Sequence, residues 1–580
     1  MHTPPSSMKP VSQEQLENLR RRLARLYGDD CAGDLLERLH FLVGRYGVQF
    51  DVADFRTQWD EKDVLLITYG DNIHRSAEAP LRTLSRFCKQ YLEGLFSTIH
   101  ILPFYPWSSD DGFSVIDYRE VDSNLGSWED VSELGRNFDL MFDLVLNHCS
   151  AQSTWFGDFL VGIEPARHYF LEYDSKEDLS HVVRPRTSPL LTPATTREGL
   201  THVWTTFSPD QVDLNWKNPD VLFEFLDILM LYLSKGCRML RLDAVAFLWK
   251  KIGTDCLHLP ETHEVVKLLR DFLEIVAPHA VLLTETNVPH EENISYFGNG
   301  SNEAHMVYQF SLPPLLLHGL LNGTAKHISD WASKLPFPSN ECTFLNFTAS
   351  HDGIGVRPLQ GLLSVSEIEE LVEKVESRGG LISWKNNSDG SRSPYELNIT
   401  LVSALSEPND ESLGVERFLC SQAVALAMKG IPAVYIHSIT GTQNYKDGVE
   451  ATGRNRTINR LKWQEEELLH ILEDRESMQS TIFYRYSDML RRRSEHLAFH
   501  PSSRQEILSL NDMVFGFIRE DLTSGERITC LFNFSASEQS VKSSAVGGNI
   551  SRVDLLTGSK IEAGEDIPLR PYQALWLLQN

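Results

Sequence analysis

Two residues that could do chemistry lie inside one apolar run of the sequence. Arg241 and Asp243 are two residues apart in the run 239–245, which follows Lys235-Gly236. Such a run predicts a buried strand, and period-two alternation places both charged side chains on the same side of it. A buried carboxylate beside a buried guanidinium is costly unless the pair is used or fully hydrogen-bonded. By itself, the pair is equally consistent with a structural ion pair.

Other polar residues also follow apolar runs that predict strands. Glu285 comes after Val281-Leu282-Leu283, and His351 and Asp352 follow the run that begins at Thr343. Similar positions are held by Tyr69, Asp71, Asp143, Asn147 and His148. One such residue alone is most often structural. If they gather at one end of a sheet, packing does not explain them, because each unused buried charge would cost several kcal/mol.

This set of side chains suits glycosyl transfer through an oxocarbenium-like transition state. One carboxylate must attack the sugar in its ionised form, and we predict Asp243 for this step, with Arg241 lowering its pKa. A second carboxyl group must donate a proton, and the environment of Glu285, close to Asp243, should raise its pKa. We predict that Asp352 binds the sugar hydroxyls most strongly in the distorted ring.

The elements that must position these residues repeat as strand, helix, strand along the chain. This order predicts parallel strands joined by right-handed crossovers. Eight such units favour an α/β fold of the closed (β/α)8 TIM barrel type, in which active sites lie at the carboxyl ends of the strands. The predicted strands span 64–71, 98–103, 138–146, 237–245, 280–286, 307–311, 343–350 and 432–437.

Segments outside the barrel pattern predict additional domains. Ser12 to Gln15 has the form of a helix capping box, and a second helix is predicted after Gly33. Short alternating apolar runs near the C-terminus predict an antiparallel sheet. The predicted units are an N-terminal helical segment (1–60), the catalytic barrel (61–503) with an inserted subdomain at about 149–205 and a loop subdomain at about 356–398, and a C-terminal β domain (504–580).

Composition and charge exclude several classes of partner. The formal charge of -26 argues against nucleic acid or an anionic membrane surface as a partner. An anionic substrate is still allowed, but its site must be a local cluster of Arg, Lys and N–H groups. No apolar run approaches membrane-spanning length, and the N-terminus lacks a signal-peptide core. The 8 cysteines are spread singly, which favours reduced thiols and a cytoplasmic protein.

Four ordered motifs in the chain resemble those of the α-amylase superfamily. They are 143–148 (DLVLNH), 241–245 (RLDAV), 284–286 (TET) and 349–353 (ASHDG). The resemblance implies a (β/α)8 barrel with Asp243 as nucleophile, Glu285 as acid/base and Asp352 as transition-state stabiliser. It also implies roles in holding the glucosyl ring for Asp71, His148, Arg241, His351 and, by stacking, Phe156. Some members of the superfamily hold a metal near the position of Asn147, but the oxygen-ligand set is incomplete here, and we predict neither a metal nor a cofactor.

Within that superfamily, the sequence looks most like the sucrose phosphorylase branch. The segment 351–357 (HDGIGVR) resembles that branch's form of the last motif. The segment 184–186 (RPR) is similar to a loop that binds phosphate, which implies this role for Arg186. The segment 394–398 (PYELN) implies that Tyr395 assists phosphate, and 458–460 (INR) implies that Arg460 contacts the sugar. Phosphate can compete with water only where such donors hold it against the glucosyl-enzyme.

The predicted activity is therefore retaining phosphorolysis of a small α-glucoside by inorganic phosphate, which gives α-glucose 1-phosphate. The segments 253–263 and 103–112 look like those of branch members that act on glucosylglycerate. Glycerate carries a carboxylate, for which Arg454, Arg456 or His258 could supply the cation. Sucrose, sucrose 6'-phosphate and glucosylglycerol remain alternative substrates. A hydrolase or transglucosidase is a further alternative, which a phosphate requirement would exclude, and a non-catalytic relative is disfavoured because all three carboxylates are present.

Overall fold

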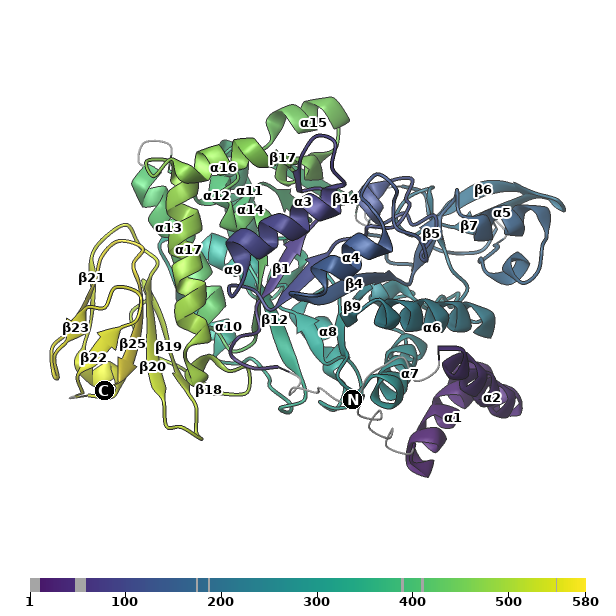
Figure 1. Ribbon diagram of the computed structural model, residues 1–580, viewed down its shortest axis with the longest axis horizontal. Coiled ribbons are helices and arrows are strands. Elements are labelled where there is room, and N and C mark those ends of the chain that lie inside the picture. Colours follow the sequence, from purple (N-terminus) through teal and green to yellow (C-terminus); the bar gives the residue numbers. More distant parts are fainter. Residues whose placement is uncertain are drawn as a thin grey trace, which may run out of the picture.

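The computed structural model describes residues 11–46, 59–173, 176–185, 188–386, 391–407, 411–548 and 550–579. Within them, eight parallel strands close into a barrel in the order β1-β16-β12-β11-β10-β9-β4-β3 (Figure 1). The predicted (β/α)8 fold is therefore confirmed. The barrel strands are β1 (Leu65–Thr68), β3 (Thr98–Ile101), β4 (Asp139–Val145), β9 (Cys237–Asp243), β10 (Val281–Thr284), β11 (Met306–Tyr308), β12 (Thr343–Phe347) and β16 (Ile431–Tyr435).

Burial on both faces explains why these strands are nearly unbroken apolar runs. Every residue of β9 is buried, because helices cover the outside of the barrel and side chains fill its inside. The register aligns Arg241 of β9 with Asp143 of β4, and Leu242 with Thr284 of β10. The carboxyl ends of these three strands therefore lie side by side, at the edge where the polar residues are found.

Helices alternate with the strands and surround the barrel (Figure 1). Two of the longest, α6 and α7, begin with Pro219 and Pro260, which suit the first turn because proline lacks an N–H and has a helical φ. The helices of this layer are α3 (Pro80–Phe87), α4 (Trp128–Leu134), α6 (Pro219–Ser234), α7 (Pro260–Val276), α8 (His290–Ile294), α9 (Leu312–Asn322), α10 (Lys326–Ala332), α12 (Leu401–Leu405), α13 (Glu411–Ala427), α14 (Ile436–Ile439), α15 (Lys446–Thr452), α16 (Glu465–Glu473) and α17 (Met478–Ser494).

The N-terminal segment forms two helices, α1 (Gln13–Tyr27) and α2 (Asp29–Tyr46). The predicted capping box at Ser12 is confirmed. The prediction that the second helix begins after Gly33 is wrong, because α2 starts directly after Gly28 and continues through Gly33. Its apolar face extends on both sides of that glycine, and packing outweighs the intrinsic cost of glycine in a helix, about 1 kcal/mol. Arg22 joins α1 to α7 through an ion pair with Asp271 at 3.0 Å.

Two insertions interrupt the barrel at the carboxyl ends of its strands. After β4, the chain forms β5 (His148–Ser150), α5 (Thr154–Val161), a hairpin of β6 (Leu191–Thr196) and β7 (Gly199–Trp204), and β8 (Gln211–Asp213), which pairs with β5. After β12, it forms β13 (Ile354–Gly355), α11 (Val365–Ser377), β14 (Leu381–Asn386) and β15 (Arg392–Asn398), whose strands make an antiparallel sheet in the order β13-β15-β14. The boundaries of the predicted subdomains stay predictions.

The C-terminal part of the chain is an antiparallel sheet in the order β18-β19-β20-β25-β22-β23, as the sequence predicted. It lies beside α17, at the opposite end of the long axis from the first insertion (Figure 1). Its strands are β18 (Arg504–Ile507), β19 (Val514–Glu520), β20 (Arg527–Asn533), β22 (Arg552–Asp554), β23 (Lys560–Ile561) and β25 (Ala574–Gln579), and β21 (Gln539–Val541) pairs separately with β24 (Ile567–Leu569).

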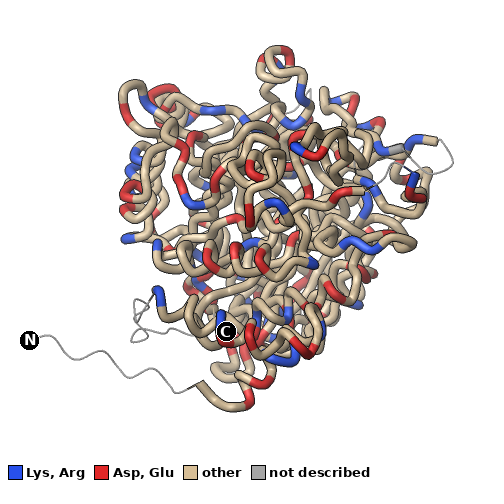
Figure 2. Tube along the Cα trace, turned by 90° about the vertical axis from the view of Figure 1, so that its right-hand side faces the viewer, with Lys and Arg blue, Asp and Glu red and all other residues tan. Residues whose placement is uncertain are grey.

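Figure 2 shows acidic and basic positions intermixed along the whole trace, so the net charge of -26 does not arise from one acidic segment. Neither the barrel helices nor the others in the described ranges combine the length and apolar character needed to cross a membrane.

Candidate active site

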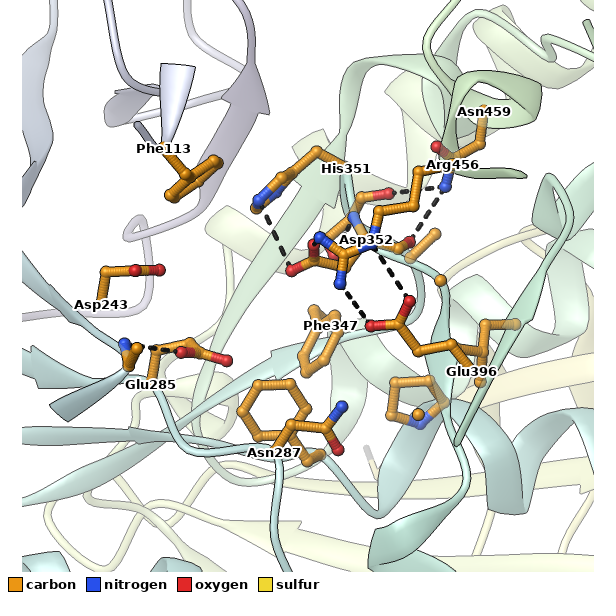
Figure 3. A pocket seen from close by; sticks show the side chains of 18 of the residues that line it. Phe113, Asp243, Glu285, Asn287, Phe347, His351, Asp352, Glu396, Arg456 and Asn459 are labelled. Carbon is orange, nitrogen blue, oxygen red and sulfur yellow. Dashed lines mark hydrogen bonds and ion pairs between the residues drawn. The ribbon is translucent and has the colours of Figure 1, made fainter. Parts of the chain in front are cut away.

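A cavity opens where the ends of the barrel strands meet the two insertions (Figure 3). Barrel residues and insertion residues both line it, so neither part of the chain forms the cavity alone. The residues used below that line it are Asp110, Phe113, His148, Gln211, Arg241, Asp243, Glu285, Asn287, Gly355, His351, Asp352, Tyr395, Glu396 and Arg456. The three predicted carboxylates therefore share one cavity.

Arg241 links the carboxylates on the floor of the cavity. Its Nη1 donates to Asp243 Oδ1 at 2.7 Å and also to Asp143. Its Nη2 lies 3.9 Å from Glu285 Oε2. Asp143 is held from its other side by His100 Nε2 at 2.7 Å. Burial opposes ionisation of Asp143, but Arg241 and His100 keep its pKa below the ordinary value. Asp143 is therefore a fixed charge that orients Arg241.

The environment of Asp243 differs from the prediction. Burial raises the pKa of Asp243 above its ordinary value, and Arg241 opposes this rise without cancelling it, since the charge of Asp143 acts in the other direction. Arg241 does lower the pKa of Asp243 as predicted, but burial and Asp143 outweigh its contribution, so the net pKa is raised. The Arg241 guanidinium group thus limits the cost of ionising the Asp243 carboxyl group, which is almost fully buried.

The pKa of Glu285 is raised into the range that suits a general acid. Burial raises the pKa of Glu285 to about 7, Arg241 opposes this, and the charges of Asp243 and Asp352 add to it. Its Oε2 accepts a hydrogen bond from the Ala244 N–H at 3.0 Å. Ala244 has a φ of 50°, a left-handed conformation that is unusual for a residue other than glycine. This turn after Asp243 aims the N–H at the acid.

Asp352 is held ionised by cations on the far wall (Figure 3). Burial disfavours its charge, but the positive charges of Arg456 and Arg460 lower the pKa of Asp352 well below its usual range. Arg456 Nη1 lies 2.6 Å from Asp352 Oδ1, and Arg456 Nε donates to Glu396 Oε2 at 3.1 Å. Glu396 belongs to β15. The second insertion therefore positions the Arg456 guanidinium group, which in turn pairs with Asp352.

The end of the cavity next to Asp243 has aromatic and imidazole walls. The Phe113 ring stacks on His351, with centroids 5.0 Å apart and planes at 6°. Burial lowers the pKa of His351 to about 3, so it is neutral at pH 7. His148 Nε2 lies 3.0 Å from the Phe113 carbonyl oxygen. Arg460 Nε donates to the His351 carbonyl oxygen at 2.9 Å. The flat Phe113 ring and the neutral His351 imidazole suit a sugar ring.

Several predicted residues lie outside the cavity lining. Phe156 stacks on Phe159 of the same helix at 5.5 Å, inside an aromatic cluster, because its position on α5 faces the core of the insertion. Asp71 pairs with Lys462 at 2.5 Å. Arg454 is exposed, and its Nη1 lies 4.0 Å from Asp111. His258 lies 3.0 Å from Tyr296 Oη through Nδ1. Their assigned roles stay predictions, and Arg186 is outside the described residues.

The structure adds cavity residues that the sequence analysis did not select. Phe113, Gln211, Asn287 and Glu396 all line the cavity. Two of them carried a signal. Asn287 comes two residues after Glu285, and Glu396 directly follows Tyr395, which does line the cavity as predicted. Phe113 lies in an irregular segment, and Gln211 lies in the short strand β8. In such segments, periodicity does not predict which way a side chain points.

A lysine occupies the oxygen-rich site beside Asn147. Lys250 Nζ lies 2.6 Å from Asp213 Oδ2 and from the Phe247 carbonyl oxygen, and 2.5 Å from Asn147 Oδ1. All of these groups are buried. Over the described ranges, no group of three or more His, Cys, Asp or Glu side chains is arranged to hold a metal. An ammonium group thus bridges the end of β4, β8 and the segment after Asp243.

The eight-stranded barrel and the four sequence motifs, each of which contributes residues to the cavity, define a barrel of the α-amylase type. Residues 89–328 match the family described as alpha amylase, catalytic domain. The chain is 47% identical to a glucosylglycerate phosphorylase of Escherichia coli (strain K12) over 90% of this chain and 93% of that protein. It is 45% identical to a glucosylglycerate phosphorylase of Allomeiothermus silvanus over 98% of this chain and 100% of that protein. The chain therefore belongs to the α-amylase family, in the group of the glucosylglycerate phosphorylases.

Relatives with other substrate names are more distant. A sucrose phosphorylase of Agrobacterium vitis is 31% identical over 76% of this chain and 90% of that protein. The crystal structure of sucrose 6F-phosphate phosphorylase from Thermoanaerobacter thermosaccharolyticum superposes with a TM-score of 0.72 at 25% identity, over 90% of this chain and all of that one.

Proposed function

We propose that this chain is a retaining glucoside phosphorylase whose substrate is 2-O-α-glucosyl-D-glycerate. The observation that carries the chemistry is the single cavity with three carboxyl groups in distinct environments, one of which has a pKa near neutrality. The choice of phosphorolysis and of glycerate is supported by the relatives of 45–47% identity that bear this name. The products are α-D-glucose 1-phosphate and free D-glycerate, and we place the reaction in the cytoplasm.

In the first step, a carboxylate oxygen of Asp243 attacks the anomeric carbon and the bond to the glycerate oxygen breaks. The proton on Glu285 passes to that oxygen, which leaves as a hydroxyl group of free glycerate. A β-glucosyl-enzyme remains. A pKa of about 7 suits Glu285 for both halves of the cycle, because it must give a proton in this step and accept one in the next. Asp352, which stays ionised, binds the sugar hydroxyls.

In the second step, a phosphate oxygen attacks the same carbon from the face that glycerate left, and its proton passes to Glu285. Two inversions give net retention. Phosphate must compete with water at about 55 M, so it needs donors that hold it against the intermediate. Tyr395 lines the cavity and can donate one hydrogen bond, and the resemblance assigns a second donor to Arg186.

Of the three cations predicted for the glycerate carboxylate, Arg456 fits best by position, but its guanidinium group already pairs with Asp352 and Glu396. Arg456 lines the cavity, whereas Arg454 is exposed. Burial, followed by the nearby His263 and Arg357, lowers the pKa of His258 to about 4, so this imidazole is neutral at pH 7 and supplies no charge. Asn287 also lines the cavity, and its Oδ1 is buried without a hydrogen-bond partner.

The test is a screen for phosphate release from glucose 1-phosphate, with D-glycerate, fructose, fructose 6-phosphate or glycerol offered singly as acceptors. We expect release with D-glycerate and much less with the others. Release only with fructose or glycerol would keep the mechanism but refute the acceptor. If no acceptor releases phosphate while an activated α-glucoside is hydrolysed, the phosphorylase assignment is wrong.

A further inference from the structure

The arginines at the cavity are committed to carboxylates. The pairs are Arg241 with Asp143 and Asp243, Arg456 with Asp352 and Glu396, and Arg460 with Asp111. In every case, the carboxylates equal or outnumber the guanidinium groups. These arginines orient catalytic groups, but they leave no net positive charge for an anion that has to enter from solvent.

Arg357 and Lys385 do not follow this pattern. Both side chains are partly buried. Across the described part of the chain, neither side chain makes an ion pair or a hydrogen bond. The Nε of Arg357 is buried and has no hydrogen-bond partner. A guanidinium that is partly out of water normally finds a carboxylate or a carbonyl, so this pair of cations calls for a physical explanation.

Both cations belong to the insertion that walls the cavity. The three-stranded sheet pairs Gly355 with Glu396, and the next hydrogen bond runs from the Val356 N–H to the Tyr395 carbonyl oxygen at 3.1 Å. Arg357 follows directly. From the other edge of the same sheet, Lys385 pairs with Ser393, two residues from Tyr395. Gly355, Tyr395 and Glu396 all line the cavity, so the two cations flank the strand that carries Tyr395.

The two cations are also close enough to repel each other. Burial lowers the pKa of Lys385, and the positive charge of Arg357 adds to this effect. Like charges that lose part of their hydration are unfavourable together until an anion binds between them. On a chain with a charge of -26, such a cluster is the kind of local feature that can attract an anion at all.

We propose that Arg357 and Lys385 form an oxyanion-binding site at the edge of the cavity, which receives phosphate in one reaction direction and the glycerate carboxylate in the other. The identity of these anions rests on the proposed function. The two ligands share the chemistry that matters, because each presents oxygen atoms that a guanidinium and an ammonium group can bind together.

The experiment is the double variant Arg357→Gln/Lys385→Gln in the full-length protein. We expect kcat/KM for phosphate, and for glycerate in the reverse direction, to fall about 10- to 100-fold, the range typical of lost electrostatic attraction. The phosphate-dependent rate should fall relative to the water-dependent rate on α-glucosyl fluoride. The charge-keeping variant Arg357→Lys/Lys385→Arg should recover most of the loss, which a damaged fold would not do.

The matched control is Arg491→Gln/Lys560→Gln, which removes the same net charge at two exposed positions, on α17 and on β23. We expect it to behave like the wild type. An equal loss in both double variants, or no loss in the first, overturns the proposal. A loss for phosphate alone or for glycerate alone assigns the site to that anion.

Calorimetric titration with inorganic phosphate separates this inference from the proposed function. If the wild type shows no phosphorolysis with any acceptor, the proposed function fails, yet weaker phosphate binding by the double variant still supports the site. If phosphate binds both proteins equally and kcat/KM is unchanged, the site is refuted whatever the reaction is.

Discussion

The two ends of the cavity are built from different parts of the chain, and they differ in how tightly their charges are balanced. At the end around Asp243, the groups come from barrel strands and their ends, and Arg241 joins Asp143 and Asp243 closely and Glu285 at 3.9 Å. At the other end, Tyr395 and Glu396 come from an inserted sheet, and Arg357 and Lys385 beside it lack any carboxylate partner among the described residues. The barrel end is pre-arranged for one sugar, whereas the inserted end can accept different anions.

The largest effect should come from the barrel end. Asp243→Ala should reduce phosphorolysis by at least about 10⁴-fold, because no other group is placed to form the glucosyl-enzyme. Glu285→Gln is the informative partner, since α-glucosyl fluoride has a leaving group that needs no acid. We expect Glu285→Gln to release fluoride and Asp243→Ala not to. Fluoride release by Asp243→Ala would refute its role as nucleophile.

The next effect concerns the ammonium group under the barrel end. Lys250→Met should lower the free energy of unfolding by about 3–5 kcal/mol, because it leaves the buried Asp213 carboxylate without its partner. Urea denaturation measures this. The neighbouring Lys251 is exposed, so Lys251→Met should stay within about 0.5 kcal/mol of the wild type. Equal stability of the two variants would show that the Lys250 contacts contribute nothing net.

A smaller effect is expected for a substitution at the proposed acceptor-binding position. Asn287→Asp places a carboxylate beside the proposed position of glycerate, so kcat/KM for glycerate should fall about 100-fold through like-charge repulsion. For an uncharged acceptor such as glycerol, the loss should be only a few-fold, and Asn287→Ala should show no such discrimination. Initial rates at each variant's best pH provide the comparison. Equal losses for both acceptors would place the acidic end of glycerate elsewhere.

The smallest effect is a pH dependence. Glu285 must be protonated to release the acceptor, and its pKa is raised to about 7. The acid-assisted first step should therefore fall as pH rises through 7, approaching about tenfold per pH unit well above the pKa. Hydrolysis of α-glucosyl fluoride by Glu285→Gln should lack this alkaline limb. A limb that persists in that variant would have to belong to another group.

The contrast between the two ends also describes what the sequence could and could not predict. The eight strands were found because burial on both faces leaves unbroken apolar runs, and the residues at their ends follow from barrel geometry alone. The link from Asp352 through Arg456 to Glu396 joins three distant segments, and no local pattern reports such a pairing.

What the sequence could not predict has equally specific causes. The pKa of Asp243 was expected from one neighbour, but the outcome depends on burial and on Asp143, which only the register of β4 and β9 brings close. Phe156 was assigned to the sugar by resemblance, and this role stays a prediction, since its ring packs against Phe159 and Phe170. Lys250 was missed because its three oxygen partners come from separate segments.

The left-handed residue after the nucleophile has a consequence for stereochemistry. Ala244 shares a peptide bond with Asp243, and its N–H holds the Glu285 carboxyl group. This hydrogen bond ties the Glu285 carboxyl group to the main chain directly after Asp243. Retention of anomeric configuration depends on the spacing of the Asp243 and Glu285 carboxyl groups. Under the proposed function, the barrel end therefore decides which anomer is made, whichever acceptor binds at the inserted end.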